Sequence, residues 1–117
     1  EPAEKANKYQ EAVIACSRAI KLHPNYVSAI ANRGIYNSCL GNFKEAEADL
    51  RRAISMYPKH FAGTYTLGAL LANQGRFDEA REIWEGLLEK YPDDKMLRDS
   101  YARLLGDINR KSSSGEK

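Results

Sequence analysis

The chain repeats itself at an interval of 34 residues, and this interval constrains the fold more than any other feature. Residues 41–46 (GNFKEA) return as residues 75–80 (GRFDEA), and the prolines Pro24, Pro58 and Pro92 keep the same spacing. A fixed period of about 20 to 50 residues is typical of repeat architectures, in which each unit buries its apolar face against its neighbours. The sequence therefore predicts one structural unit that is used several times.

Each unit has the pattern of two helices that are separated by a glycine turn and closed by a proline. Apolar residues recur at three- and four-residue steps, which is the spacing of one helix face. Gly41 and Gly75 are expected to end helices because glycine accepts the left-handed conformation. The prolines are expected to end helices as well, because proline disfavours helical geometry in the residue before it and lacks an N–H to donate. We expect helices over residues 3–22, 26–40, 43–57, 60–73, 77–90 and 94–109. Asn42 is expected to cap a helix in a capping box with Glu45, and Asp93 to cap the last helix.

This period, with a small residue in the first helix and alanines in the second, resembles the tetratricopeptide repeat (TPR) over residues 8–109. The resemblance implies an all-α fold, a right-handed α-solenoid of antiparallel helix pairs with about six helices. The expected parts are the second helix of a truncated first repeat, two full repeats, a capping helix and a disordered tail. They cover residues 1–26, 27–60, 61–94, 95–110 and 111–117. The alternative is a helical bundle whose loops happen to have equal lengths.

The two full units differ inside the helix pair. Arg33 and Asp49 in the first unit stand where the second has Leu67 and Ile83. We therefore expect an ion pair between Arg33 and Asp49, with Arg33 reaching water alone as the alternative. Trp84 is expected to fill the core beside small residues, although a functional aromatic site is the other interpretation.

Composition narrows the class of partner. The chain has a formal charge of +2, yet residues 61–94 carry three basic and seven acidic residues, which argues against a continuous nucleic-acid surface. Cys16 and Cys39 show no paired framework, which favours a reducing compartment, cytoplasmic by default. No apolar run is long enough for membrane insertion. The first residues look like the cut end of a longer protein rather than a signal peptide.

No catalytic centre, cofactor or metal site is predicted. His23 and His60 fall at inter-helix corners and are expected to be solvated loop residues, and Cys39 is expected to be a small packing residue. The two histidines and two cysteines lack metal-ligand spacing. An acidic cluster on one helix is expected to be a solvated face, or otherwise a docking patch for a basic partner. It consists of Asp78, Glu79, Glu82, Glu85 and Glu89.

Resemblance to the TPR family implies a concave groove lined by the first helix of each repeat. By register, the expected peptide-binding residues are Ser28, Ala31, Asn32, Ile35, Cys39, Tyr65, Thr66, Ala69, Asn73, Asp99 and Arg103, and the same helix faces also present Ser38, Ala62, Met96 and Ser100. For Asn32 and Tyr65, the alternative is that they are ordinary exposed helix residues. Some family members clamp the C-terminal carboxylate of a ligand with basic and polar residues on consecutive first helices. Only Asn32 fits that pattern here. Ala31, Ala62 and Thr66 stand where the other basic or polar clamp residues would be expected.

Three functional hypotheses follow. The leading one is a non-catalytic protein–protein interaction module, or scaffold, that binds a partner peptide in the groove. The second is a scaffold that forms a homo-oligomer through the apolar face of the first helix, at Ala12, Cys16 and Ala19. The third is the regulatory or targeting arm of a larger enzyme.

Overall fold

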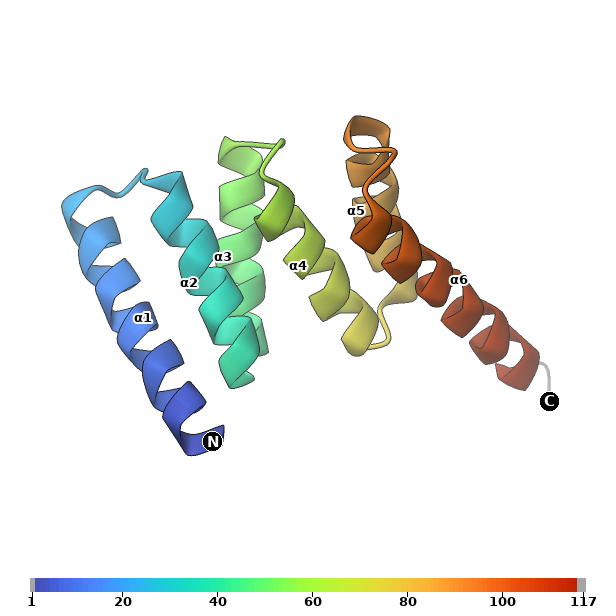
Figure 1. Ribbon diagram of the computed structural model, residues 1–117, viewed down its shortest axis with the longest axis horizontal. Coiled ribbons are helices and arrows are strands. Elements are labelled where there is room, and N and C mark those ends of the chain that lie inside the picture. Colours follow the sequence, from blue (N-terminus) through green and yellow to red (C-terminus); the bar gives the residue numbers. More distant parts are fainter. Residues whose placement is uncertain (1, 116–117) are drawn as a thin grey trace.

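The computed structural model describes residues 2–115, with side chains placed for residues 2–112, and this part of the chain contains six helices and no strand. The helices are α1 (Pro2–Leu22), α2 (Val27–Leu40), α3 (Phe43–Met56), α4 (Phe61–Asn73), α5 (Phe77–Lys90) and α6 (Lys95–Gly115). They form an elongated row that measures 50 × 33 × 22 Å, in which consecutive helices run in opposite directions (Figure 1). The predicted all-α solenoid is confirmed.

Two glycine turns produce the short connections inside the full units. Gly41 and Gly75 have φ values of 83° and 77°, which lie in the left-handed region. The turns also satisfy carbonyl groups at the helix ends. Asn42 N–H donates to the carbonyl of Asn37, and Arg76 N–H to that of Leu71, each at 2.9 Å. The left-handed conformation of a glycine therefore allows the chain to reverse direction at both turns.

Two predicted helix caps are wrong. The side chain of Asn42 makes no cap hydrogen bond, so the capping box with Glu45 is absent. Asn42 Nδ2 donates instead to Asn37 Oδ1 at 3.0 Å, because the buried Asn37 amide needs a partner. At the start of α6 the cap is Asp94 rather than Asp93, and its Oδ1 accepts from Leu97 N–H at 2.9 Å.

The last helix is longer than predicted. We expected a disordered tail from residue 111, but α6 continues to Gly115, so that prediction is wrong for residues 111–115. Asn109 stands where the earlier units have Gly41 and Gly75, and no left-handed glycine interrupts the helix at this point. Residues 116–117 lie outside the described part of the chain.

Small residues let the helices of each pair approach closely. A Cβ added to Gly34 would lie 2.8 Å from Leu50 Cγ, and one added to Gly68 would lie 2.1 Å from Trp84 Nε1. Trp84 is 4% exposed, as its position in the helix pair predicts. Large and small residues thus interlock across each pair, and a continuous core runs from Ala46 to Leu104.

The predicted ion pair between α2 and α3 is present. Arg33 Nε donates to Asp49 Oδ2 at 2.7 Å, and Arg33 Nη2 donates to Asp49 Oδ1 at 2.9 Å. A third bond, from Arg33 Nη1 to Ser17 Oγ at 3.2 Å, adds α1 to the contact. The hydrogen bonds to Asp49 raise the pKa of Arg33, so this arginine stays charged and joins three helices.

Candidate functional site

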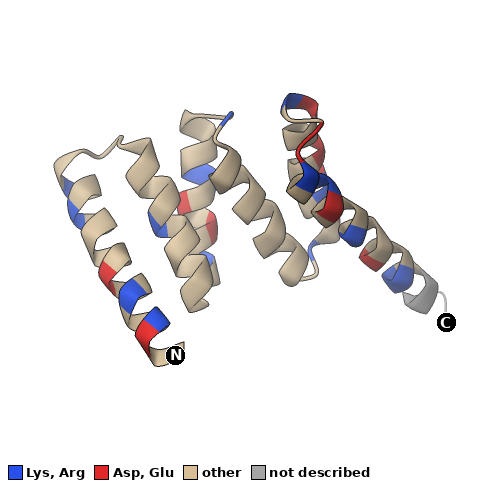
Figure 2. Cartoon of the chain, in the orientation of Figure 1, with Lys and Arg blue, Asp and Glu red and all other residues tan. Residues whose placement is uncertain are grey.

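Helices α2, α4 and α6 share one side of the molecule, while α3 and α5 lie behind them (Figure 1). We call this side the α2–α4–α6 face. Its chemistry is unusual for a charged chain, because α4 contains no charged residue and α2 contains only Arg33 (Figure 2). Since Arg33 is bound by Asp49, the centre of the face is formed by neutral side chains.

The predicted groove residues differ in their exposure. Those exposed to solvent are Ser28, Asn32, Cys39, Asn73, Asp99 and Arg103. Those that are half-buried are Ile35, Tyr65, Thr66 and Ala69. The amides of Asn32 and Asn73 form no hydrogen bond to other described residues, so both retain their donors and acceptors.

Ala31 does not belong to the groove surface. It is 0% exposed and clusters with Ile30 and Ala53. A Cβ added to Gly63 would lie 3.7 Å from the Ala31 Cβ, so Ala31 occupies the contact between α2 and α4. The prediction that Ala31 contacts a ligand is wrong, because this part of α2 packs directly on the next first helix.

A pocket of about 260 Å³ opens between α4 and α6. Its lining comprises Tyr65, Ala69, Ala72, Asn73, Trp84, Ser100, Arg103, Leu104 and Asp107. Tyr65 connects the walls, because its hydroxyl is 2.7 Å from Ser100 Oγ and its ring stacks on Trp84 with centroids 5.6 Å apart. The pocket therefore brings Tyr65, Ala69, Asn73 and Arg103, four of the predicted groove residues, to one place.

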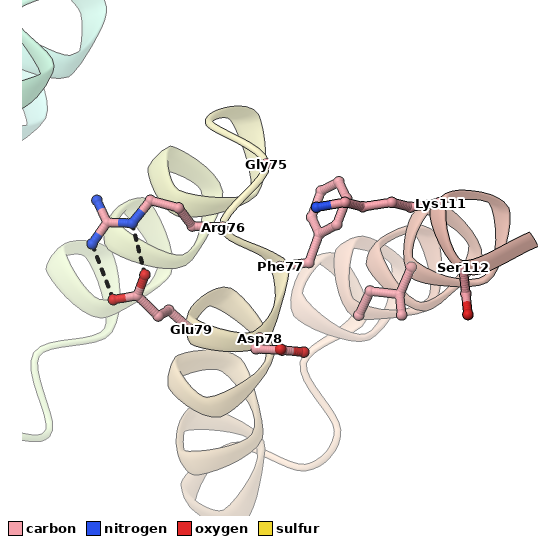
Figure 3. A pocket seen from close by; sticks show the side chains of 8 residues that line it. Gly75, Arg76, Phe77, Asp78, Glu79, Lys111 and Ser112 are labelled. Atoms are coloured by element: carbon pink, nitrogen blue, oxygen red, sulfur yellow. Dashed lines mark hydrogen bonds and ion pairs between the residues drawn. The ribbon is translucent and has the colours of Figure 1, made fainter. Parts of the chain in front are cut away.

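A larger hollow of about 700 Å³ lies between the start of α5 and the end of α6 (Figure 3). Arg76 and Glu79 face each other there, and Lys111 Nζ lies 5.2 Å from the centre of the Phe77 ring. The charged groups of Arg76 and Glu79 are thus engaged inside the chain. We place the candidate site on the α2–α4–α6 face, at the pocket between α4 and α6, where the amide of Asn73 is unpaired among the described residues.

An ion-pair network on the opposite side was not predicted from the sequence. Arg76 binds Glu47 of α3 at 2.7 Å and Glu79 of α5 at 2.7 Å, and Arg51 contacts the same two carboxylates at 2.8 and 3.3 Å. The hydrogen bonds from Arg76 lower the pKa of Glu47 and of Glu79 and raise the pKa of Arg76 itself. Arg76 replaces the Asn42 of the first unit, and this exchange is the signal that could have revealed the network.

Part of the predicted acidic face also makes contacts inside the chain. Glu79 belongs to the Arg76 network, and Glu85 accepts from the hydroxyl of Tyr101 at 2.5 Å. This hydrogen bond raises the pKa of Tyr101. Glu82 and Glu89 are exposed, as expected of a solvated face.

The histidines and cysteines are dispersed over the fold. The prediction that His60 is a solvated loop residue is wrong. Its Nδ1 accepts from Gly63 N–H at 3.0 Å, so His60 caps α4. Burial raises the pKa of the Cys16 thiol, which favours its neutral form. Within residues 2–115 no group of three or more His, Cys, Asp or Glu side chains is arranged to hold a metal ion. In the same range, none of the helices combines the length and apolarity needed to cross a bilayer.

Comparisons with known proteins agree with this architecture. The family model of the tetratricopeptide repeat matches residues 40–104. The chain therefore belongs to the tetratricopeptide repeat family. No curated protein matches the chain.

Several solved structures share the fold. TTC0263, a thermophilic TPR protein of Thermus thermophilus, is 30% identical with a TM-score of 0.75, over 83% of this chain and 50% of that protein. The chain thus spans half the length of the Thermus protein. The first TPR domain of human RPAP3 has a TM-score of 0.83 at 22% identity, over 97% of this chain and 94% of that domain. The first TPR of Spaghetti (RPAP3), bound to the HSP90 peptide SRMEEVD, has a TM-score of 0.80 at 21% identity, over 91% of each chain.

Proposed function

We propose that the chain is a non-catalytic interaction module that binds an extended segment of a partner protein on its α2–α4–α6 face. The observation that carries this proposal is the set of unpaired amides and neutral side chains on that face. An extended segment must find partners for its backbone N–H and C=O groups. An asparagine amide offers both a donor and an acceptor, so Asn32 and Asn73 suit this task.

The position of the two amides supports the same conclusion. Asn32 lies on α2 and Asn73 on α4, so a segment that crosses both helices meets one amide from each unit. Tyr65 lies on α4 as well and supplies ring surface beside a hydroxyl group. Such a face holds the backbone of a ligand and leaves its side chains to decide specificity.

The comparison with the RPAP3 domain is consistent with peptide binding by this fold. We do not propose that this chain binds the same HSP90 peptide. Ala62 and Thr66 are neutral and stand at positions where a carboxylate clamp needs basic or polar residues. We therefore place recognition in the amides and the pocket rather than in a cluster of cations.

A peptide array probed with the labelled chain tests the proposal. Binding to the best array peptides is expected to fall on Asn32→Ala and on Tyr65→Ala, by roughly 2- to 12-fold for each lost neutral hydrogen bond. Charge reversal at the exposed Glu82 of α5 is the control and should leave binding unchanged. Circular dichroism of each variant shows whether the fold is retained. Loss of binding on Glu82→Lys, with retention on Asn32→Ala, would place the partner on the acidic face and contradict the proposal.

A further inference from the structure

We propose that the pocket between α4 and α6 selects a segment in which an aliphatic side chain lies within a few residues of an acidic side chain. The aliphatic group enters the pocket, and the carboxylate pairs with Arg103 at its rim. This inference rests on the proposed function, because it specifies the kind of segment that the α2–α4–α6 face binds.

The volume of the pocket fits a side chain. At about 260 Å³, it is smaller than the roughly 300–1,000 Å³ of sites that enclose drug-sized molecules. The hollow exists because Ala69 and Ala72 line it. In the register of the repeat, Ala69 corresponds to Ile35 of α2, so the first unit has a larger side chain where the second leaves space.

The polar atoms nearest the base of the pocket already have partners. Trp84 Nε1 donates to the carbonyl of Tyr65 at 3.1 Å, and the Tyr65 hydroxyl is paired with Ser100. Trp84 and Leu104 are 4% and 2% exposed and form the base of the hollow. A polar group that reached this base would lose its water without gaining a hydrogen bond from Trp84 or Leu104, so an aliphatic group is favoured at the base, while the free amide of Asn73 remains available to the ligand backbone.

Arg103 is the charged residue of the pocket lining that has no partner among the described residues. Asp107 is paired with Arg110, and Asp99 is paired with Lys95 at 3.3 Å. Arg103 is exposed and forms no ion pair or hydrogen bond with any other described residue. Because α4 is uncharged, a ligand that lies along it meets Arg103 as the available cation of the pocket. Charge complementarity therefore selects a carboxylate.

Geometry restricts the spacing of the two ligand groups. Arg103 lines the same pocket that receives the aliphatic side chain. An extended segment advances about 3.4 Å per residue, so a separation of roughly one to three positions keeps both groups in reach.

Defined peptides of about ten residues test the inference. Each carries one leucine and one glutamate at a separation of one, two or three positions in a Gly/Ser background. Acetylated and amidated ends remove the terminal charges, so that only the side chain supplies a carboxylate. Matched peptides have Gln in place of Glu, Ala in place of Leu, or Gln in place of Glu together with a free C-terminal carboxylate. Binding is measured by fluorescence anisotropy at low ionic strength.

The protein variants match these peptide changes. Arg103→Gln removes the cation, Ala69→Ile fills the hollow with the residue of the neighbouring unit, and Arg98→Gln is the control because Arg98 is exposed on α6 but does not line the pocket. With the unmodified protein, replacing Glu by Gln in the best peptide should weaken binding roughly tenfold. With Arg103→Gln, the Glu and Gln peptides should bind equally. With Ala69→Ile, the Leu peptide should bind no better than the Ala peptide.

Equal binding of the Glu and Gln peptides to the unmodified protein would overturn the inference, and so would a preference for Glu that survives Arg103→Gln. Binding that depends only on the free C-terminal carboxylate would overturn it too. If the array peptides of the proposed function still depend on Asn32, these results leave that function standing. If no array peptide binds either, both proposals are overturned. Should Ala69→Ile fail to fold, the Arg103 comparison decides the outcome.

Discussion

At the scale of single residues, Gly68 is the described glycine at which an added Cβ would meet another side chain most closely. A Cβ at this position would lie 2.1 Å from Trp84 Nε1, 2.4 Å from Trp84 Cδ1 and 2.6 Å from Trp84 Cε2. Trp84 cannot move away freely, because its Nε1 is bonded to the Tyr65 carbonyl and its ring stacks on Tyr65. Gly68→Ala should therefore lower the free energy of unfolding by about 1–3 kcal/mol.

Gly86 provides the matched control for Gly68. It is exposed in the middle of α5, and a Cβ at this position meets no atom within 4 Å. Gly86→Ala should raise the free energy of unfolding by up to about 1 kcal/mol, because alanine favours the helix over glycine. Urea unfolding followed by circular dichroism measures both variants. Equal effects at the two positions would contradict the steric explanation.

The Arg33–Asp49 pair gives a second prediction at the residue scale. Asp49→Ala leaves the partly buried Arg33 without its carboxylate and should cost about 1.5–3 kcal/mol of unfolding free energy. The double change Arg33→Leu with Asp49→Ile installs the apolar pair of the second unit, Leu67 and Ile83. It should recover most of that loss, because well-packed apolar residues replace such pairs at little cost. Thermal unfolding of the three proteins tests this, and a double variant no more stable than Asp49→Ala would contradict it.

At the scale of elements, the three first helices begin at equivalent positions with different caps. Tyr26 makes no side-chain cap hydrogen bond, His60 caps α4 through Nδ1, and Asp94 caps α6 through Oδ1. The three helices of the α2–α4–α6 face thus begin at equivalent turns, but only α4 and α6 have a side-chain cap hydrogen bond there. The strength of each cap depends on whether its side chain can accept from an early backbone N–H.

The cap of α4 can be tested by substitution. His60→Ala should lower the free energy of unfolding by about 0.5–2 kcal/mol, because Gly63 N–H loses its acceptor. His60→Asp should retain most of the stability, since Asp94 performs the same role for α6. His23→Ala, at an exposed corner, is the control and should have little effect. Chemical denaturation at neutral pH is the measurement, and an unchanged His60→Ala protein would show that the cap contributes nothing.

At the scale of the whole molecule, Arg76 connects one repeat to the next. It lies immediately before α5 and binds Glu47 of α3 as well as Glu79 of α5. Its hydrogen bonds hold the pKa values of both glutamates below the ordinary value of 4.5. A carboxylate whose pKa is lowered by folding stabilises the folded state above the unfolded pKa, and this contribution is lost as the pH falls through the folded pKa.

Arg76→Gln should therefore lower Tm at pH 6, and the difference from the unmodified protein should shrink as the pH falls below about 4.5. High salt should shrink the difference as well, because the network is largely exposed. Differential scanning calorimetry between pH 3 and 6 measures it. Arg81→Gln is the control, since its contacts of 3.8 and 4.0 Å are long and exposed. A Tm difference that does not vary with pH would contradict the role of Glu47 and Glu79.

Much of the fold could be predicted from local chemistry. Gly41 and Gly75 end helices because glycine readily adopts the left-handed conformation, and this preference can be predicted from the sequence alone. The Arg33–Asp49 pair could be predicted because both residues change together between units. The Asn42 cap could not, because Asn42 is drawn to the buried amide of Asn37. Such competition between a local and a tertiary partner is invisible to spacing rules.

The sequence by itself determined the repeated unit, the approximate helix boundaries and the pairing of helices, since each depends on residues that are close in the chain or related by the period. Only the tertiary structure decided that Ala31 is buried, that Arg76 joins two repeats, and that a pocket opens between α4 and α6. These features depend on how helices from different units meet. Burial and ion pairing across such contacts are set by distances in space, and the 34-residue period does not encode them.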